Sequence, residues 1–356
     1  MKIAIDCRHI DSSGIGVYTR ECLPYFLNSP NDFLLLGDLE VLNIFSIFKN
    51  AEIIDCPVKT FSLHELIAFP WHIKRKVNAC DAYYTPYFNI PGGIRIPVFV
   101  TMHDIVFLDM PDLVSPIGYY ARKFFYYRAI KKCRETITIS EFSKERILSH
   151  FGRKKNVFNA SNAVVDYSGY YKFNDDKENI ILFIGNIKTH KGLKFLLNAY
   201  IMALREGLDY NLYIIGEKDN FRTYDKDVSI LIDSIDNDKI RFTGHISETE
   251  KWQLLQKSAV LVQPSLYEGF CYPPLEAMYS GTCVILSDIQ VFKEIYSDFP
   301  VTFFRSGDSA DLKEKIMEML HNRLPHTITL PPELRDKYTF KNTVEAILKE
   351  MENCVK

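Results

Sequence analysis

The part of the sequence that decides the fold is a strand, a loop and a helix start at 259–281, which reads Ala-Val-Leu-Val-Gln-Pro-Ser-Leu-Tyr-Glu-Gly-Phe-Cys-Tyr-Pro-Pro-Leu-Glu-Ala-Met-Tyr-Ser-Gly. Its beginning, Ala259 to Gln263, is short and almost continuously apolar, as expected of a parallel strand that helices cover on both faces. Pro273 and Pro274 favour the first turn of a helix. Glu268 therefore belongs to the loop after a strand, and Glu276 belongs to the first turn of a helix.

Short runs of the same kind alternate with longer helical patterns along the rest of the chain, which predicts an α/β fold. The other strand candidates are Lys2 to Ile5, Phe33 to Leu36, Ala82 to Thr85, Pro97 to Thr101, Thr136 to Ile139, Ile180 to Ile184, Asn211 to Ile215, Ile240 to Thr243 and Thr282 to Leu286. The strand–helix rhythm of both halves predicts two Rossmann-like, doubly wound domains that face each other across a cleft.

The length of 356 residues favours two domains over one or three. A polar segment without periodicity, 164–179, separates two strand–helix series and is typical of an interdomain linker. We therefore expect an N-terminal domain at 1–165, a linker at 166–178 and a C-terminal domain at 179–339. A C-terminal helix at about 340–356 is expected to pack back on the first domain.

Charge and cysteine content argue against several classes of protein. The chain has 43 Lys and Arg residues against 45 Asp and Glu residues, so it has no net positive field to attract nucleic acid. It shows no signal peptide pattern and no stretch near the roughly 20 apolar residues that cross a bilayer. Its eight cysteines include no Cys-x-x-Cys pair, which argues against zinc ribbons and favours reduced thiols in a cytoplasmic protein.

Loops with glycine after predicted strands are candidates for phosphate binding. The Gly14-Ile15-Gly16 loop permits a tight turn and a close backbone approach before a helix, and an ordinary turn is the alternative. In the loop from Gly185 to Gly192, Lys191 lies at a predicted helix N-terminus, where a cation and the helix dipole together hold a diphosphate. A solvated lysine beside a turn glycine is the alternative there.

Glu268 and Glu276 are both expected to face the cleft. Carboxylates accept hydrogen bonds from sugar hydroxyls, and each such charge-assisted bond contributes roughly 1.5 to 3 kcal/mol. Taken singly, Glu276 has the alternative of stabilising its helix dipole, and Glu268 that of an ordinary loop charge. Their spacing and the Gly, Phe and Pro residues around them favour a pair that binds sugar.

The pattern Ser265-x-x-Glu268-Gly-Phe-x-x-Pro-x-Leu-Glu276-Ala-Met-x-x-Gly resembles the signature of the retaining glycosyltransferases of family 4, also called group 1, whose two Rossmann-like domains form the GT-B fold. Further matches occur in family order along nearly the whole chain: the Gly14 to Gly16 loop, His103-Asp104 after a strand, Ser140-Glu-Phe-Ser143, Gly185 to Gly192, Gly216 after a strand, and Phe242-x-Gly244-x-Ile-Ser.

The resemblance implies that the C-terminal domain binds a nucleotide diphosphate sugar, the donor. Glu276 would accept ribose hydroxyls, and the catalytic Glu268 would hold hydroxyls of the donor sugar. Lys191 would be the catalytic cation on the diphosphate. The other donor-binding residues that the resemblance implies are Gly185, Asn186, His190, Gly216, His245, Ile246, Ser265, Gly269, Phe270 and Cys271, with the backbone at His245 and Ile246 reading the base.

The resemblance also implies roles in the N-terminal domain. The loop of Gly14, Ile15 and Gly16 would close over donor and acceptor, and His103 would lie near the transferred sugar as a catalytic residue. A packed, hydrogen-bonded histidine is the alternative for His103.

One position departs from the family pattern. Many members carry Arg directly after the glycine of the phosphate loop, where this chain has Asn186. Lys191 is then expected to act with His190 or Lys188 on the diphosphate.

No metal or other cofactor is expected. Asp225-Lys-Asp227 and Asp236-Asn-Asp238 have the spacing of paired metal ligands, but both lie among polar residues where Asp and Asn favour turns. The resemblance implies metal-independent transfer with retention, by attack on the front face of the sugar while the leaving phosphate takes the acceptor proton.

A basic, aromatic segment at 115–134 suggests where the acceptor is found. It contains no acidic residue, and such a helix can rest on anionic lipid. Its charges do not collect on one face, so a core-packing helix with extended Lys and Arg side chains is the alternative. Lys74, Arg75 and Lys76 add a second basic cluster in the same domain.

Together these observations predict a retaining hexosyltransferase, with mannosyl as the favoured sugar, that acts in surface polysaccharide synthesis. Its partners would be a nucleotide-sugar donor and a saccharide or lipid-linked acceptor, and its place the cytoplasm, with peripheral contact at the inner face of the membrane. The alternatives are a GT-B nucleotide-sugar epimerase and a non-catalytic nucleotide-sugar-binding partner.

Overall fold

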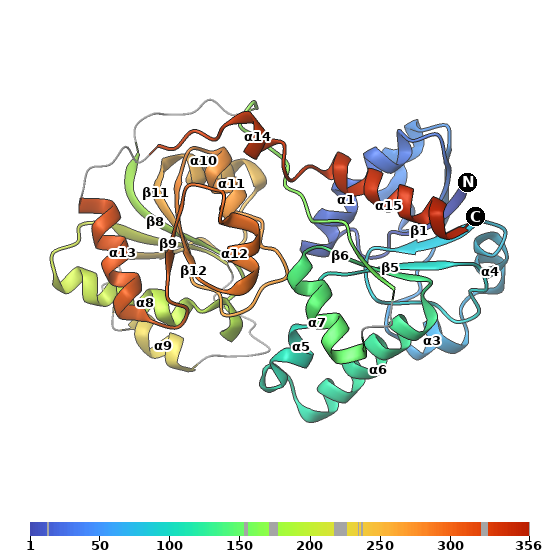
Figure 1. The fold of residues 1–356 in the computed structure, drawn as a ribbon, viewed down its shortest axis with the longest axis horizontal. Coiled ribbons are helices and arrows are strands. Elements are labelled where there is room, and N and C mark those ends of the chain that lie inside the picture. The colour runs from blue at the N-terminus through green and yellow to red at the C-terminus, as the bar shows by residue number, and fades with distance from the viewer. Residues whose placement is uncertain are drawn as a thin grey trace. The chain divides into compact units, whose positions relative to one another are not determined.

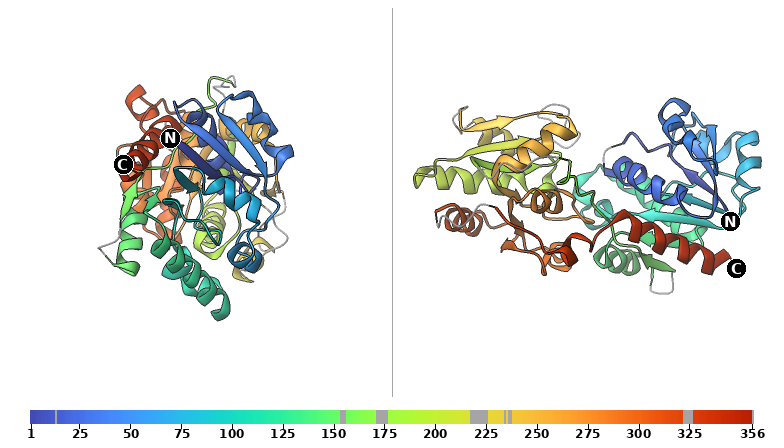
Figure 2. Two further views of the ribbon diagram at one scale, coloured as in Figure 1. Left: turned by 90° about the vertical axis from the view of Figure 1, so that its right-hand side faces the viewer. Right: turned by 90° about the horizontal axis from the view of Figure 1, so that it is seen from above.

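The computed structural model describes residues 1–12, 14–152, 156–170, 177–216, 226–233, 235, 238–321 and 327–355. The chain forms two compact units, which are Met1–Ala163 with Tyr338–Lys356, and Val164–Lys337. Each unit has one parallel sheet with helices on both faces (Figures 1 and 2). The α/β fold predicted from the sequence is confirmed.

The sheet of unit 1 has seven strands in the order β3-β2-β1-β4-β5-β6-β7, and all its neighbours pair in parallel. The strands are β1 (Lys2–Asp6), β2 (Asp32–Gly37), β3 (Ala51–Asp55), β4 (Ala82–Thr85), β5 (Val98–Met102), β6 (Glu135–Thr138) and β7 (Val157–Asn159). The helices are α1 (Gly14–Leu27), α2 (Leu39–Leu42), η1 (Asn43–Ile47), α3 (Leu63–Ile67), α4 (Trp71–Val77), α5 (Val106–Asp109), η2 (Pro111–Leu113), α6 (Pro116–Lys132), α7 (Glu141–Phe151) and α15 (Phe340–Val355).

The sheet of unit 2 has six strands in the order β10-β9-β8-β11-β12-β13, again all parallel. They are β8 (Glu178–Ile184), β9 (Asn211–Ile215), β10 (Ile240–Phe242), β11 (Ser258–Gln263), β12 (Cys283–Ser287) and β13 (Val301–Phe304). The helices are η3 (Thr189–Lys191), α8 (Leu193–Arg205), α9 (Lys226–Asp233), α10 (Glu248–Lys257), α11 (Pro273–Tyr279), α12 (Gln290–Tyr296), α13 (Ser309–His321) and α14 (Pro332–Arg335).

Each sheet has a topological switch point, where the connections on its two sides run in opposite directions. In unit 1, β2 lies on one side of the first strand and β4 on the other, so the switch point lies between β1 and β4. In unit 2 the same arrangement places it between β8 and β11. Open α/β sheets bind ligands at such points, just beyond the carboxyl ends of the strands.

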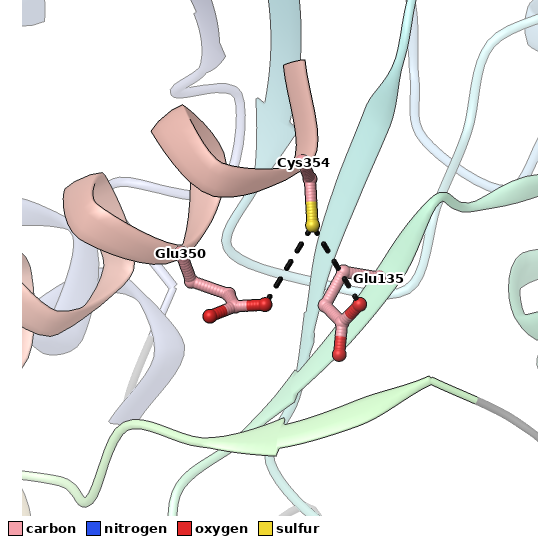
Figure 3. A group of neighbouring side chains, drawn as sticks. All are labelled: Glu135, Glu350 and Cys354. Atoms are coloured by element: carbon pink, nitrogen blue, oxygen red, sulfur yellow. Dashed lines mark hydrogen bonds between the residues drawn. The ribbon is translucent and has the colours of Figure 1, made fainter. Parts of the chain in front are cut away.

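The C-terminal helix α15 belongs to unit 1, where it packs along α1 (Figure 2). Thr343 donates a hydrogen bond from Oγ1 to the carbonyl of Ser161 at 2.8 Å. Near the end of the helix, the thiol of Cys354 lies between the carboxylates of Glu135 and Glu350 (Figure 3). Burial and the Glu350 carboxylate raise the pKa of Glu135 to about 7.

None of the helices in the described ranges combines the length and the apolar character needed to cross a bilayer.

Candidate functional site

The switch point of unit 2 is built from the loops that follow β8 and β11, and hydrogen bonds join these loops. Gln263 donates from Nε2 to the carbonyl of Ile184 at 2.9 Å, and the amide of Leu266 donates to the carbonyl of His190 at 2.7 Å. On the far side of β8, Gly185 lies against Gly216, which follows β9. The loops therefore form one connected surface at the carboxyl ends of the strands.

Gly192 determines how closely these two loops approach. It has φ of 69° immediately before α8, and a Cβ at this position would collide with the carbonyl of Pro264. An L side chain is disfavoured here by both the backbone conformation and the lack of space. Because Gly192 has no side chain, the two loops come close together, and the side chain of the preceding residue, Lys191, reaches the loop after β11.

Lys191 and Glu268 form an ion pair across the switch point. Lys191 Nζ lies 2.7 Å and 2.8 Å from the two carboxylate oxygens of Glu268, whose residue is 8% exposed. Ser265 Oγ donates a further hydrogen bond to Glu268 at 2.8 Å. The sequence pattern assigned these side chains to different parts of a ligand, and the structure brings them into direct contact.

The loop from Gly269 to Cys271 carries backbone strain. Cys271 has φ of 83°, a conformation that residues other than glycine rarely adopt, and Tyr296 fixes it by donating a hydrogen bond to its carbonyl at 2.6 Å. Burial raises the pKa of the Cys271 thiol well above its usual range. A strained backbone persists only where the surrounding structure holds it in place. Such strain is found most often at active sites and ligand-binding sites.

Glu276 lies in the first turn of α11, as its prolines predicted, and pairs with Lys251 of α10 at 2.8 Å. Lys251 also contacts Glu248 at 2.7 Å, and the two carboxylates raise its pKa although burial opposes them. The predicted base-reading residues, exposed His245 and half-buried Ile246, directly precede this helix. Lys251 is thus a candidate site residue that the sequence pattern did not identify.

A signal for Lys251 exists in the sequence. Ser247 and Glu250 form a capping box, which begins α10 immediately after Ile246. The capping box therefore places Lys251 in the first turn of the helix that follows the predicted base-reading loop.

His190 is a poor cation for a diphosphate. Burial, with the neighbouring Lys191 charge, lowers its pKa to about 4, so its imidazole is neutral at physiological pH. Without a ligand His190 therefore adds no charge beside Lys191, and whether His190 or Lys188 acts with Lys191 on a diphosphate stays a prediction. Its buried Nδ1 has no hydrogen-bond partner in the described part of the chain. Asn186 and Lys188 are exposed in the same loop.

In unit 1, His103 follows β5 and is hydrogen-bonded. Its Nε2 lies 2.9 Å from the carbonyl of Pro86, its ring meets Tyr18 edge to face at 4.8 Å, and burial lowers its pKa to about 4. A carbonyl only accepts, so Nε2 carries the proton of a neutral imidazole. The structure thus shows a packed histidine, and its role near the transferred sugar remains a prediction.

The sequence pattern suggested that Gly14, Ile15 and Gly16 form a loop before the first helix, but the structure does not show such a loop. They form the first turn of α1, and Thr19 Oγ1 donates to the carbonyl of Ile15 at 2.8 Å. The two glycines allow helical geometry as readily as a turn, so their presence did not locate the helix start.

Two segments with the spacing of metal ligands, Asp225 to Asp227 and Asp236 to Asp238, were predicted to be turns. Asp225, Asp236 and the side chain of Asp227 lie outside the described residues, so the structure does not test this prediction. Within the described ranges, one group of potential metal ligands occurs, Glu135, Glu350 and Cys354 of unit 1 (Figure 3).

The fold and the site at the unit 2 switch point define a two-domain α/β protein of the GT-B class. Comparison with a crystal structure of Anabaena Alr3699/HepE in complex with UDP and glucose gives a TM-score of 0.73, with 15% identity, over 99% of this chain and 100% of that chain. The GT-B fold predicted from the sequence is confirmed.

Residues 172–339 match the family model described as "Glycosyl transferases group 1". Similar proteins include the O-antigen chain mannosyltransferase RfbU of Salmonella typhimurium, 28% identical over 250 residues that make up 70% of this chain and 67% of that protein. Another is O-antigen chain mannosyltransferase B of Escherichia coli, 24% identical over 61% of this chain and 59% of that protein. The part of the chain at 172–339 is thus similar to the group 1 glycosyl transferases, and the resemblance drawn from the sequence is confirmed.

Proposed function

We propose that this protein transfers a hexosyl group, with mannosyl as the favoured sugar, from a nucleotide diphosphate sugar to a saccharide or lipid-linked acceptor in surface polysaccharide synthesis. The observation that carries the proposal is the pair of Lys191 and Glu268 at the unit 2 switch point, with Glu276 on the next helix. This arrangement supplies a cation for a diphosphate beside two carboxylates for sugar hydroxyls. The names of the O-antigen relatives support the choice of mannosyl.

The proposed chemistry assigns a role to each of these side chains. When donor binds, Lys191 exchanges its contact with Glu268 for the diphosphate at the N-terminus of α8, and Glu268 accepts bonds from hydroxyls of the sugar. The bond from the anomeric carbon to the leaving phosphate breaks while the bond to the acceptor oxygen forms on the same face. The acceptor proton passes to the leaving phosphate, so retention requires neither a protein nucleophile nor a metal ion.

Consumption of donor tests this proposal against its rivals. The protein is incubated with UDP-, GDP- and dTDP-sugars, with and without EDTA, and slow hydrolysis of one donor is expected in both conditions. An epimerase would instead convert the donor sugar without releasing nucleotide, and a non-catalytic partner would bind donor without consuming it. Loss of hydrolysis in EDTA, restored by Mg²⁺ or Mn²⁺, would overturn metal independence.

Replacement of Glu276 by Ala should weaken binding of the free nucleoside diphosphate by roughly 1 to 3 kcal/mol, the loss of charge-assisted bonds to ribose. The fold should survive because Lys251 keeps its contact with Glu248. Calorimetry with UDP and GDP measures the effect. The matched control is Glu248→Ala, which removes the other carboxylate from Lys251; an equal loss in that variant would argue against direct contact between Glu276 and ribose.

The surface of α6 supports peripheral membrane contact by the same enzyme. Ile117, Tyr120, Phe124 and Tyr127 are between 54% and 83% exposed, and their spacing places them on one face of the helix. The core-packing alternative accounts for Tyr126, Ala129 and Ile130, which are buried, but not for this apolar stripe. Exposed Lys123, Lys131 and Lys132 add the positive charge that attracts anionic lipid.

The double variant Ile117→Ser with Phe124→Ser should lose binding to vesicles that contain anionic phosphatidylglycerol, because the apolar contact area falls while the basic charges remain. Sedimentation with vesicles measures the bound fraction. Tyr170→Ser, at an exposed aromatic residue of unit 2, is the control and should bind as the wild type does. Equal vesicle binding by the double variant would exclude α6 as the contact.

A further inference from the structure

Three side chains that can bind a metal ion meet at the end of the C-terminal helix α15 (Figure 3). Glu350 and Cys354 are four residues apart on this helix, so they lie on the same face of it, and Glu135 is the first residue of β6. One ligand atom of each residue lies within 4.8 Å of the other two. The group thus joins the last turns of α15 to the sheet of unit 1.

The spacing of these atoms is close to the spacing of ligands around zinc. Cys354 Sγ lies 3.6 Å from Glu350 Oε1 and 4.0 Å from Glu135 Oε2. In a tetrahedral site with a Zn–S distance of about 2.3 Å and a Zn–O distance of about 2.0 to 2.2 Å, sulfur and oxygen ligands are roughly 3.5 Å apart. Small movements of the side chains would therefore let all three atoms bind one ion, with water as the fourth ligand.

Glu135 has no partner outside this group. The residue is 6% exposed, and within the described ranges its carboxylate makes no ion pair and no hydrogen bond apart from the contact with Cys354. A thiol is a weak donor with a single proton, and here it faces two carboxylates, so at most one of them can accept that proton at a time. A carboxylate buried in this way is costly unless a cation or further hydrogen-bond donors compensate it.

The charge around the group is mostly negative. The last turn of α15, as far as the structure describes it, has no basic residue, and a helix C-terminus carries a partial negative charge. Burial and the neighbouring carboxylates raise the pKa of Glu135 to about 7 and also raise the pKa of the Cys354 thiol, with the exposed Arg134 opposing both shifts. The group therefore has an excess of negative charge that a divalent cation would neutralise.

We propose that Glu135, Glu350 and Cys354 form a structural Zn²⁺ site that holds the C-terminal helix on the sheet of unit 1. On binding, the Cys354 thiol, and Glu135 where it is protonated, release their protons to solvent, and the thiolate and one oxygen of each carboxylate bind the ion. One thiolate with two carboxylates suits Zn²⁺ better than Mg²⁺ or Ca²⁺, which prefer oxygen ligands. Because Glu135 begins its strand, the site lies at the opposite edge of the sheet from the loops that follow the strands. It takes no part in the transfer reaction, and the proposal does not depend on the proposed function.

Metal binding is tested on the reduced, untagged full-length protein, with Co²⁺ as a spectroscopic substitute for Zn²⁺. The wild type is expected to show a thiolate-to-cobalt charge-transfer band and the intense visible bands of a tetrahedral site, and Zn²⁺ should displace the Co²⁺. Cys354→Ser should lose the charge-transfer band and bind Zn²⁺ at least about tenfold more weakly. Cys283→Ser, at a half-buried cysteine of unit 2, is the control and should keep the band. A wild type without the band, or the same band in Cys354→Ser, would overturn the site.

Hydrogen exchange followed by mass spectrometry tests whether the ion holds the helix in place. In wild type, free Zn²⁺ at about ten times its dissociation constant should slow exchange in peptides from the end of α15 and from β6 by about tenfold. Glu135→Gln should lose this protection, and without metal it should exchange no faster than wild type, since the amide removes a buried charge and nearly preserves volume. Glu345→Gln, at an exposed residue of the same helix, is the control and should respond to Zn²⁺ as the wild type does. Equal protection in Glu135→Gln, or no protection in wild type, would contradict the proposal.

Discussion

Replacing Lys191 by Ala should lower kcat/KM by about 30- to 1000-fold, or about 2 to 4 kcal/mol of transition-state stabilisation. In the unliganded protein the ammonium group neutralises Glu268, and on donor binding we expect it to neutralise the leaving diphosphate. The variant loses both interactions, because the neutral His190 cannot replace the charge. Steady-state turnover of the preferred donor measures the loss.

Two further variants identify the origin of that loss. Lys188→Ala removes a cation from the same loop and should have a much smaller effect, because it lies outside the contact with Glu268. Asn186→Arg, introduced into the Lys191→Ala background, should recover part of the activity, since a guanidinium after Gly185 would enter the same phosphate site. A nearly silent Lys191→Ala, or no recovery by Asn186→Arg, would show that the diphosphate is held elsewhere.

The strands that the sequence pattern predicted are all present, with ends displaced by at most two residues, because buried parallel strands carry continuous apolar runs. The strands it missed, β3, β7 and β13, are all at sheet edges. Most of their residues are only half-buried, as in β3 and β7, so no continuous apolar run marks them. These three strands therefore lack the apolar signal on which the prediction depends, whereas β10, which is also at a sheet edge, was predicted.

The candidate site was predictable as a set of residues but not as a set of contacts. Glu276 and Glu268 stand out in the sequence because their spacing and the adjacent prolines fix their local structure. Their partners are distant in sequence: Lys191 is 77 positions from Glu268, and Lys251 is 25 positions from Glu276. Such pairs depend on strand order in the sheet, which local patterns do not encode.

In unit 1, too, local sequence patterns did not predict contacts between residues that are distant in the sequence. The sequence pattern singled out neither Arg8 nor Glu65, although Arg8 Nη2 lies 2.5 Å from Asp6 and 2.7 Å from Glu65 in a network with almost no solvent exposure. Tyr83 and Asn89 donate further hydrogen bonds to Asp6, at 2.7 Å and 2.9 Å. The network joins β1, α3 and the end of β4, so one cation between two buried carboxylates holds the base of the unit 1 switch point.

Arg8→Met should therefore destabilise unit 1 by about 3 to 5 kcal/mol, because it leaves two buried carboxylates without their cation while roughly preserving volume. Hydrogen exchange followed by mass spectrometry measures the loss of protection in β1 and β4, with unit 2 peptides as an internal reference. The matched control is Arg20→Met, which removes a half-exposed guanidinium 3.8 Å from Asp11 in the same unit. That surface change should alter stability by less than about 1 kcal/mol.

The pH dependence of the stability of Arg8→Met shows whether the variant is destabilised by uncompensated charge or by lost packing. Burial alone would raise the pKa of Asp6, but Arg8 and its hydrogen bonds hold it below the usual range. In wild type this stabilisation is fully present above the unfolded-state pKa and is lost only as pH falls through the lower, folded-state value. Without Arg8, burial should raise the pKa of Asp6, so its protonation on going from about pH 8 to pH 5.5 should relieve part of the deficit. A deficit of equal size at both pH values would show that lost packing, and not uncompensated charge, destabilises the variant.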